Sequence, residues 1–267
     1  YNKRVLLITA MVTFIVGGLF SAIQVTEAIH SWGSYHWMRS SNPVSLKVGD
    51  NVSSIWDGYL NTAVSDWNAS TVVQLATTTG LTSPKTCKPV NGRIEVCNAK
   101  YGRNGWLGIA QIWISNSHIT QAVSKMNDTY FSVPPYNTTA WRQLVMCQEI
   151  AHDFGLDHQD ENFSNLNLGT CMDYTNNPNG PPSNEHPNAH DFEELQIIYS
   201  HLDTASTTLT ARVTAGNKKD TEMDFSEPRE WGKELRKDSH GRVSLYERDL
   251  GNGKKLITHV LWVDNAE

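Results

Sequence analysis

The segment from Gln148 to His158 carries side chains that could bind a metal ion and move a proton, in the order Gln-Glu-Ile-Ala-His-Asp-Phe-Gly-Leu-Asp-His. On a helix, Gln148 and His152 lie one turn apart on the same face and could bind one metal ion together. Gly155 lets the chain reverse, so that His158 can approach the same ion from outside the helix. Glu149 projects beside that ion, where a carboxylate can take a proton from a metal-bound water. The spacing predicts a hydrolytic metal centre.

This pattern resembles the signature of the metzincin metallopeptidases, H-E-x-x-H-x-x-G-x-x-H followed by a turn that contains methionine. Cys171-Met172-Asp173-Tyr174 is similar to that turn, and the resemblance extends over roughly residues 35–203. It implies that Glu149 is the general base and later the acid, and that a metal, Zn²⁺ in this family, polarises the water and the scissile carbonyl. It also implies that Met172 forms an apolar floor beneath the metal. Tyr174 matches a tyrosine that stabilises the oxyanion in some metzincins, with plain packing as its alternative role.

Gln148 departs from the family pattern, because the first ligand position holds an amide instead of an imidazole. An amide oxygen is a neutral and harder donor, so it should bind Zn²⁺ less tightly. Three interpretations follow. Gln148 binds metal through its oxygen in an active peptidase, as in similar algal cell-wall metzincins, which leaves copper open as the metal. Otherwise His152, His158 and water hold metal weakly, or the chain is a disabled scaffold that acts as a secreted binding protein. The presence of Glu149, which folding does not need, favours catalysis.

The sequence also predicts a substrate-binding strand and two disulfides. The segment Gly105-Trp106-Leu107-Gly108-Ile109-Ala110 resembles the family's antiparallel edge strand, which binds an extended substrate; taken alone it would be an ordinary core strand. Cys87 and Cys97 flank an Asn-Gly turn that favours a hairpin, so a disulfide between them is geometrically plausible. Cys147 and Cys171 flank the helix and the methionine turn. We expect a disulfide there too, with buried thiols or a metal ligand as the alternatives.

The elements that must position these residues follow from hydrophobic periodicity. Helices are expected at 56–67, 138–154 and 192–202, and Gly155 is placed to end the second of them. Strands are expected at 35–48, 72–77, 106–114, 119–126, 242–248 and 254–263. The expected fold class is α+β, with a twisted mixed sheet, a backing helix, an active-site helix, the methionine turn and a C-terminal helix.

The 267 residues divide into four predicted segments. Residues 1–28 have a basic flank and an uncharged apolar run, which indicates a cleaved secretory signal or a retained membrane anchor. Residues 29–203 form the expected catalytic domain, 204–222 a Ser/Thr-rich linker, and 223–267 a small hairpin appendage. The chain is therefore expected to be secreted, or anchored with its catalytic domain outside the cell.

Charge and composition limit the partners. The formal net charge is −6, which argues against nucleic acid because a phosphate-binding surface needs an excess of Lys and Arg. We expect a protein or peptide substrate, contact with a membrane only through the N-terminal segment, and a monomer. The predicted function is a metal-dependent endopeptidase that hydrolyses extracellular proteins, with zinc or another divalent metal such as copper as cofactor.

Overall fold

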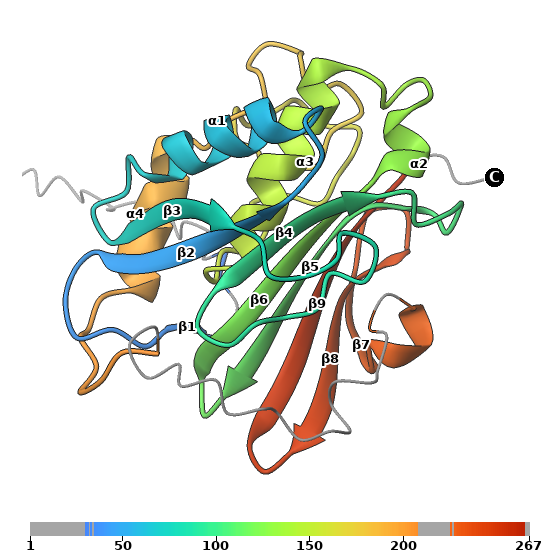
Figure 1. Ribbon diagram of the computed structural model, residues 1–267. Helices are drawn as coiled ribbons and strands as arrows, with labels where there is room; N and C mark the ends of the chain where they lie inside the picture. Colours follow the sequence, from blue (N-terminus) through green and yellow to red (C-terminus); the bar gives the residue numbers. More distant parts are fainter. Residues whose placement is uncertain (1–29, 32, 34, 208–224, 226, 265–267) are drawn as a thin grey trace, which may run out of the picture.

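The computed structural model describes residues 30–264, apart from positions 32, 34, 208–224 and 226. A single twisted sheet of nine strands runs through this part of the chain, and helices α1 and α3 pack against one of its faces (Figure 1). The structure therefore combines a mixed sheet with few helices, as the sequence predicts. Within the described residues, no helix is both long and apolar enough to cross a membrane.

The helices are α1 (Asp57–Trp67), α2 (Asp128–Phe131), α3 (Thr139–His152) and α4 (Ala189–Ile198), with a short 3₁₀ turn at Pro228–Glu230. The strands are β1 (His36–Trp37), β2 (Val44–Asn51), β3 (Val73–Thr79), β4 (Ile94–Ala99), β5 (Trp106–Ser115), β6 (His118–Asn127), β7 (Lys233–Lys237), β8 (Val243–Gly251) and β9 (Lys254–Trp262). The predicted leader, residues 1–28, lies outside the described residues, as does most of the predicted linker. The domain boundaries remain predictions.

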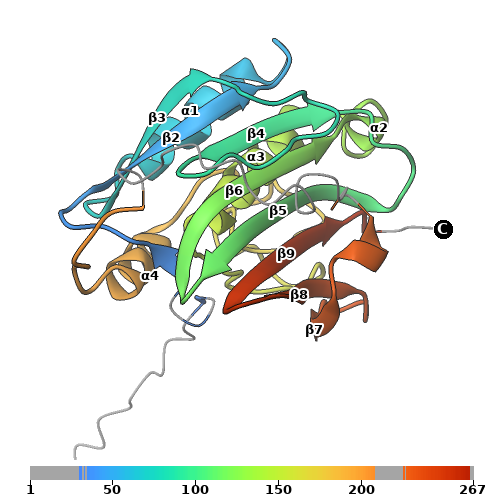
Figure 2. The same cartoon turned by 60° about the horizontal axis from the view of Figure 1, so that its bottom comes forward.

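The strand order is β3-β2-β4-β6-β5-β9-β8-β7, with β1 paired to β6 beside this path (Figure 2). Strands β3, β2, β4 and β6 are parallel, whereas β5, β9, β8 and β7 continue the sheet in antiparallel fashion. The predicted C-terminal hairpin is present as β8 and β9. Strand β7, and the pairing of β9 with the main sheet, were not predicted.

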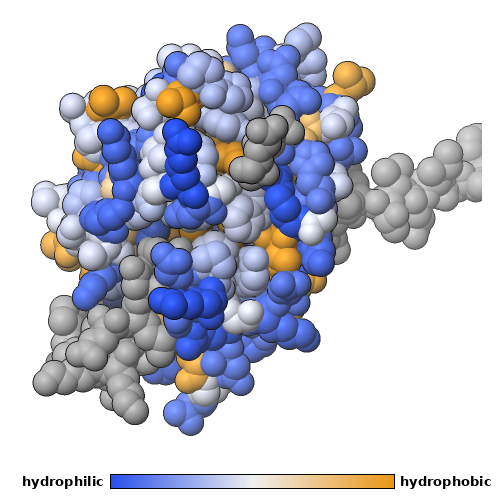
Figure 3. Space-filling model, turned by 90° about the vertical axis from the view of Figure 1, so that its right-hand side faces the viewer, coloured by the Kyte–Doolittle hydropathy of each residue, from blue (hydrophilic) through white to orange (hydrophobic). Residues whose placement is uncertain are grey.

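Strand β5 is an interior strand, which corrects the prediction of an exposed substrate-binding edge. It pairs with β6 on one side and with β9 on the other, from Trp106↔Trp262 to Ser115↔Lys254. Every residue of β5 except Ser115 is buried, because both faces are packed and both lateral neighbours are present. The sheet ends instead at β7, whose exposed side chains are mostly charged. Charges of this kind discourage further strand pairing, and Figure 3 shows that this side of the molecule is largely hydrophilic.

Helix α3 begins where the side chain of Thr138 accepts a hydrogen bond from Trp141 N at 3.2 Å. From Leu144 to its end the helix is buried on all sides. Trp67 of α1 donates its indole N–H to the Cys147 carbonyl at 3.1 Å, which fixes the two helices against each other. Polar side chains on this stretch of α3 have no access to solvent, so each needs a partner within the fold.

The segment between Cys87 and Cys97 is not the predicted hairpin. β4 begins at Ile94 and pairs in parallel with β2 and β6. This pairing gives β4 a strand on each side, whereas the predicted hairpin would give it one. Cys87 and Cys97 are nevertheless disulfide-bonded, with their Cα atoms 6.0 Å apart. Helix α1 starts after Trp56 without a side-chain cap.

Gly155, three residues after the last residue of α3, adopts a conformation that favours glycine, with φ at +106°. A Cβ atom there would lie 2.4 Å from the Tyr35 carbonyl oxygen. Gly155→Ala should therefore lower the free energy of unfolding by more than the ~1–3 kcal/mol that an unfavourable φ alone costs. Urea denaturation measures the loss. Gly102→Ala is the control, because its φ is +104° but nothing lies within 4 Å of the added Cβ. Equal losses in the two variants would contradict the close approach to Tyr35.

Candidate metal centre

Two imidazoles meet where the chain turns at the end of α3. His152 is the last residue of the helix, and the reversal at Gly155 brings His158 back against it. Their Nε2 atoms lie 2.9 Å apart, and both residues are buried. Trp37 fixes the turn by donating its indole N–H to the Asp153 carbonyl at 2.8 Å. The local sequence thus brings together the two histidines that its spacing predicts.

The other ring nitrogen of each histidine already has an acceptor as its partner. His152 Nδ1 lies 2.8 Å from the Leu156 carbonyl oxygen, and His158 Nδ1 lies 2.7 Å from Glu161 Oε1. Although burial raises the pKa of Glu161, hydrogen bonds and charge from His158 and the charge of Arg236 lower it to about 2. Glu161 is therefore an ionised acceptor, and both Nδ1 atoms carry the proton.

This choice of tautomer leaves two lone pairs facing each other. Burial, followed by the proximity of His158, lowers the pKa of His152 well below its usual value, so its ring is neutral. Two neutral rings in these tautomers would repel at 2.9 Å unless a proton or a metal ion is bound at one of the two Nε2 atoms. Nδ1 donating to a carbonyl or a carboxylate while Nε2 ligates is the usual arrangement for a metal-bound histidine. These two residues fit a metal ion.

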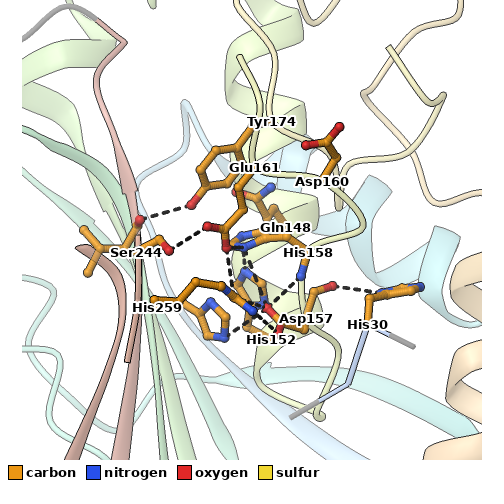
Figure 4. A network of polar contacts seen from close by, with 12 residues as sticks. His30, Gln148, His152, Asp157, His158, Asp160, Glu161, Tyr174, Ser244 and His259 are labelled. Carbon is orange, nitrogen blue, oxygen red and sulfur yellow. Dashed lines mark hydrogen bonds and ion pairs between the residues drawn. The ribbon is translucent and has the colours of Figure 1, made fainter. Parts of the chain in front are cut away.

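A third imidazole, which sequence analysis missed, comes from β9. His259 stacks on His152 with ring centroids 3.9 Å apart and an angle of 7°, and its centroid is 5.1 Å from that of His158. One nitrogen from each of the three rings lies within 4.8 Å of the others, and all three residues are buried (Figure 4). Burial, followed by the two neighbouring imidazoles, lowers the pKa of His259 well below its usual value. Two features of the sequence could have pointed to His259: it is a lone histidine in an apolar strand, and the motif lacks a histidine at its first ligand position.

Gln148 lies one turn before His152, as predicted. Its amide nitrogen donates to the Cys171 carbonyl at 2.8 Å, and its Oε1 is buried without a hydrogen bond from the described residues. Figure 4 shows Gln148 among the histidines. Its contact with Cys171 joins α3 to the methionine turn, which the Cys147–Cys171 disulfide also joins. These cysteines are therefore not metal ligands.

Glu149 is buried, and neither carboxylate oxygen has a hydrogen-bond partner among the described residues. Burial, followed by the charge of Asp153, raises the pKa of Glu149 well above its usual value. Strand β5 approaches this carboxylate closely, because a Cβ on Gly108 would lie 2.2 Å from Glu149 Oε1. A buried carboxyl without partners is costly in a purely structural role.

The segment 171–174, which is similar in sequence to a methionine turn, lies beside His158. Met172 is buried in the main core, and its carbonyl accepts a hydrogen bond from Gln159 N at 2.7 Å, next to His158. The Tyr174 ring packs against His158 with centroids 4.5 Å apart. Its hydroxyl donates to the Val260 carbonyl of β9 at 3.2 Å. Tyr174 therefore has a packing contact and also a polar contact that points towards β9.

Charged side chains fasten the C-terminal strands to the loop that carries His158. Arg236 of β7 contacts both oxygens of Asp157, at 2.5 and 2.6 Å, and Glu161 at 2.8 Å. Ser244 of β8 donates to the other oxygen of Glu161 at 2.7 Å. Asp157 and Glu161 could form a separate cation site with His158, but the guanidinium of Arg236 already forms an ion pair with each of the two carboxylates. This cluster holds β9 beside α3.

No protein-family model matches the chain, and a search of curated proteins found no match. Among solved structures, the chain is similar to high choriolytic enzyme 1, a hatching-enzyme zinc protease from the medaka fish Oryzias latipes. The two chains are 12% identical, with a TM-score of 0.33 over 63% of this chain and 96% of the fish enzyme. Similarity this distant does not assign a family or a function to the chain.

The ion-pair cluster should contribute to stability through Arg236. Arg236→Met keeps most of the side-chain volume but leaves Asp157 and Glu161 without their cation, so the free energy of unfolding should fall by about 1–3 kcal/mol. Chemical denaturation measures the change. Arg229→Met is the control, because that side chain is 82% exposed and lies 3.8 Å from its acidic neighbour; it should change stability by less than about 0.5 kcal/mol. Equal effects of the two variants would contradict a structural role for the cluster.

Proposed function

We propose that this chain is a metal-dependent endopeptidase in which His152 and His158 hold a divalent metal ion and Glu149 is the general base. The observation that carries the proposal is the pair of buried Nε2 atoms 2.9 Å apart, in rings whose Nδ1 atoms face a carbonyl oxygen and a carboxylate oxygen. Imidazole suits zinc and copper among the common protein metals. Zinc is the expected ion, with copper as the second candidate. Gln148 Oε1 is a further oxygen donor at the same helix face.

A bound metal of this kind would polarise a substrate carbonyl and lower the pKa of a water molecule. Glu149 lies on the same face of α3, one turn before His152, with both oxygens available. It can accept the proton of the attacking water and return it to the leaving amine. The Tyr174 hydroxyl already donates to a backbone carbonyl oxygen of an antiparallel strand, so it can donate to the carbonyl of a bound peptide.

The proposed substrate is an extended polypeptide that would replace β9 beside β5, because β5 has no free edge while β9 is paired with it. Strand β9 lies against β5 in antiparallel register, with Ile109 opposite Val260 and Ala110 opposite His259. That pairing supports the capacity of β5 to receive a strand beside the metal centre. The two disulfides fit an oxidising compartment, which supports an extracellular substrate and a secreted or membrane-anchored enzyme.

A second candidate is a binding protein with a metal-containing but non-catalytic centre. The same β9 pairing favours it, since the strand position that a substrate would need on β5 is filled by the chain itself. The two candidates differ in whether the protein has a hydrolytic activity that requires the Glu149 carboxylate.

The test compares metal content and casein hydrolysis of the full chain and its Glu149→Gln variant. Both are made in the natural background and with Arg236→Met, which loosens the C-terminal strands. Hydrolysis should fall by roughly 10²–10⁴-fold in Glu149→Gln with the metal retained, because only the proton acceptor is lost. Glu193→Gln, at an exposed residue of α4, should leave hydrolysis unchanged. Bound metal without Glu149-dependent hydrolysis in either background would favour the binding protein.

Gln148→His tests whether the chain has lost its metal through the missing imidazole. If the natural chain is metal-competent, it should be purified without chelator with an equimolar divalent metal, and Gln148→His should not be needed for binding. Metal analysis of both proteins measures this. Metal and hydrolysis that appear only in Gln148→His would mean a disarmed peptidase and would contradict the proposal.

A further inference from the structure

We propose that His259 is the third protein ligand of the metal centre, so that the C-terminal strands supply the imidazole that α3 lacks at Gln148. The inference rests on the proposed function for the presence of a metal. It adds a ligand from outside the motif. It also links metal binding to the pairing of β9 with β5, which we call the cover because it occupies the side of β5 that a substrate strand would need.

The distances suit a shared ion. Around a tetrahedral zinc with Zn–N bonds of 2.0–2.1 Å, ligand nitrogens lie about 3.3 Å apart. The nitrogens of His152, His158 and His259 all lie within 4.8 Å of one another, and the closest pair is at 2.9 Å. Small side-chain rotations bring such a set to ligand distance. A set of three imidazoles also leaves a fourth position for water or for Gln148 Oε1.

The placement of His259 in β9 is unusual for a histidine with no function. Side chains alternate across a strand, so His259 shares its face with Ile257 and Leu261, both of which belong to the main core. An imidazole between two core aliphatic residues, 1% exposed, loses its hydration on folding. Its Nε2 lies 3.8 Å from Asp157 Oδ1, and metal ligation would add a bond of about 2.0–2.1 Å.

Gln148 has a different task in this arrangement. Its amide nitrogen binds the Cys171 carbonyl and so holds the methionine turn against α3. His259 of β9 takes the ligand role that a histidine at position 148 of α3 would have. Arg236 and Ser244 set that approach, because both bind the loop that carries His158.

Coupling between the metal and the cover follows from this geometry. β9 pairs with β5 over the whole length of that strand, and the Val260 carbonyl accepts the Tyr174 hydrogen bond that we assign to a substrate carbonyl. A peptide can pair with β5 only after β9 leaves. Since His259 leaves with β9, a metal bound by all three histidines stabilises the covered form. Metal binding and substrate access thus oppose each other.

The first test measures zinc affinity of the full chain by competition with a chromophoric chelator. His259→Phe keeps the ring stacked on His152 but removes the ligand, and its affinity should fall by more than the roughly 10–100-fold that loss of an outer-shell partner costs. His240→Phe is the control, since His240 lies in the turn between β7 and β8 and stacks on Phe163 outside the cluster. All variants carry His201→Asn, because His36, His201 and Asp203 form another group that could bind zinc.

A second measurement needs no variant at the site. X-ray absorption of the zinc-loaded chain should count three imidazoles, and two would overturn the assignment even if His259→Phe failed to fold. Hydrogen exchange of the β9 amides should slow when zinc is added to the natural chain but not to His259→Phe. Equal exchange with and without zinc in the natural chain would overturn the coupling.

The outcomes separate this inference from the proposed function. Tight zinc binding that is equal in the natural chain and in His259→Phe would overturn the role of His259 and leave the His152–His158 peptidase intact. Absence of zinc binding in the natural chain would overturn both. Loss of affinity in His259→Phe with full affinity in His240→Phe supports the ligand role, whatever the activity of the loaded protein.

Discussion

The opposition of His152 Nε2 and His158 Nε2, 2.9 Å apart in a buried setting, is the constraint on which the site depends. Each ring is fixed by a hydrogen bond from its Nδ1, to Leu156 on one side and to Glu161 on the other. Neither ring can turn away without losing a buried partner. The surrounding structure, from the reversal at Gly155 to the ion pairs of Arg236, holds these two lone pairs together and makes a cation the natural complement.

The C-terminal strands convert this pair into a closed centre. Through β9 they supply a third imidazole, fill the free side of β5 and engage the hydroxyl of Tyr174. Arg236 and Ser244 tie the same strands to the loop behind His158. The proposed metal centre and the strand that occupies the side of β5 therefore share His259, so in the proposed enzyme stability gained by closing the centre would oppose substrate entry. The strand that would limit substrate access, β9, belongs to the same sheet as β5.

Much of the fold could be predicted, because its signals are local. The amphipathic pattern of α3, the turn at Gly155 and the alternation of β8 and β9 are set by neighbouring residues. The pairing of Cys87 with Cys97 was expected from a hairpin that does not form; the disulfide depends on β4 lying beside β2 and β6. The prediction of β5 as an edge strand failed because a strand does not encode which distant segment pairs with it.

The sequence by itself determined the two histidines, the carboxylate of Glu149 before them and the glycine that reverses the chain, since these depend on spacing within one helix and one turn. Only the tertiary structure decided that His259, more than a hundred positions from His152 along the chain, joins them, and that β9 covers β5. Long-range strand pairing and the Arg236 ion pairs bring those residues together, and neither leaves a local pattern to read. The position of His259 beside His152 and the pairing of β5 with β9 are therefore properties of the assembled sheet.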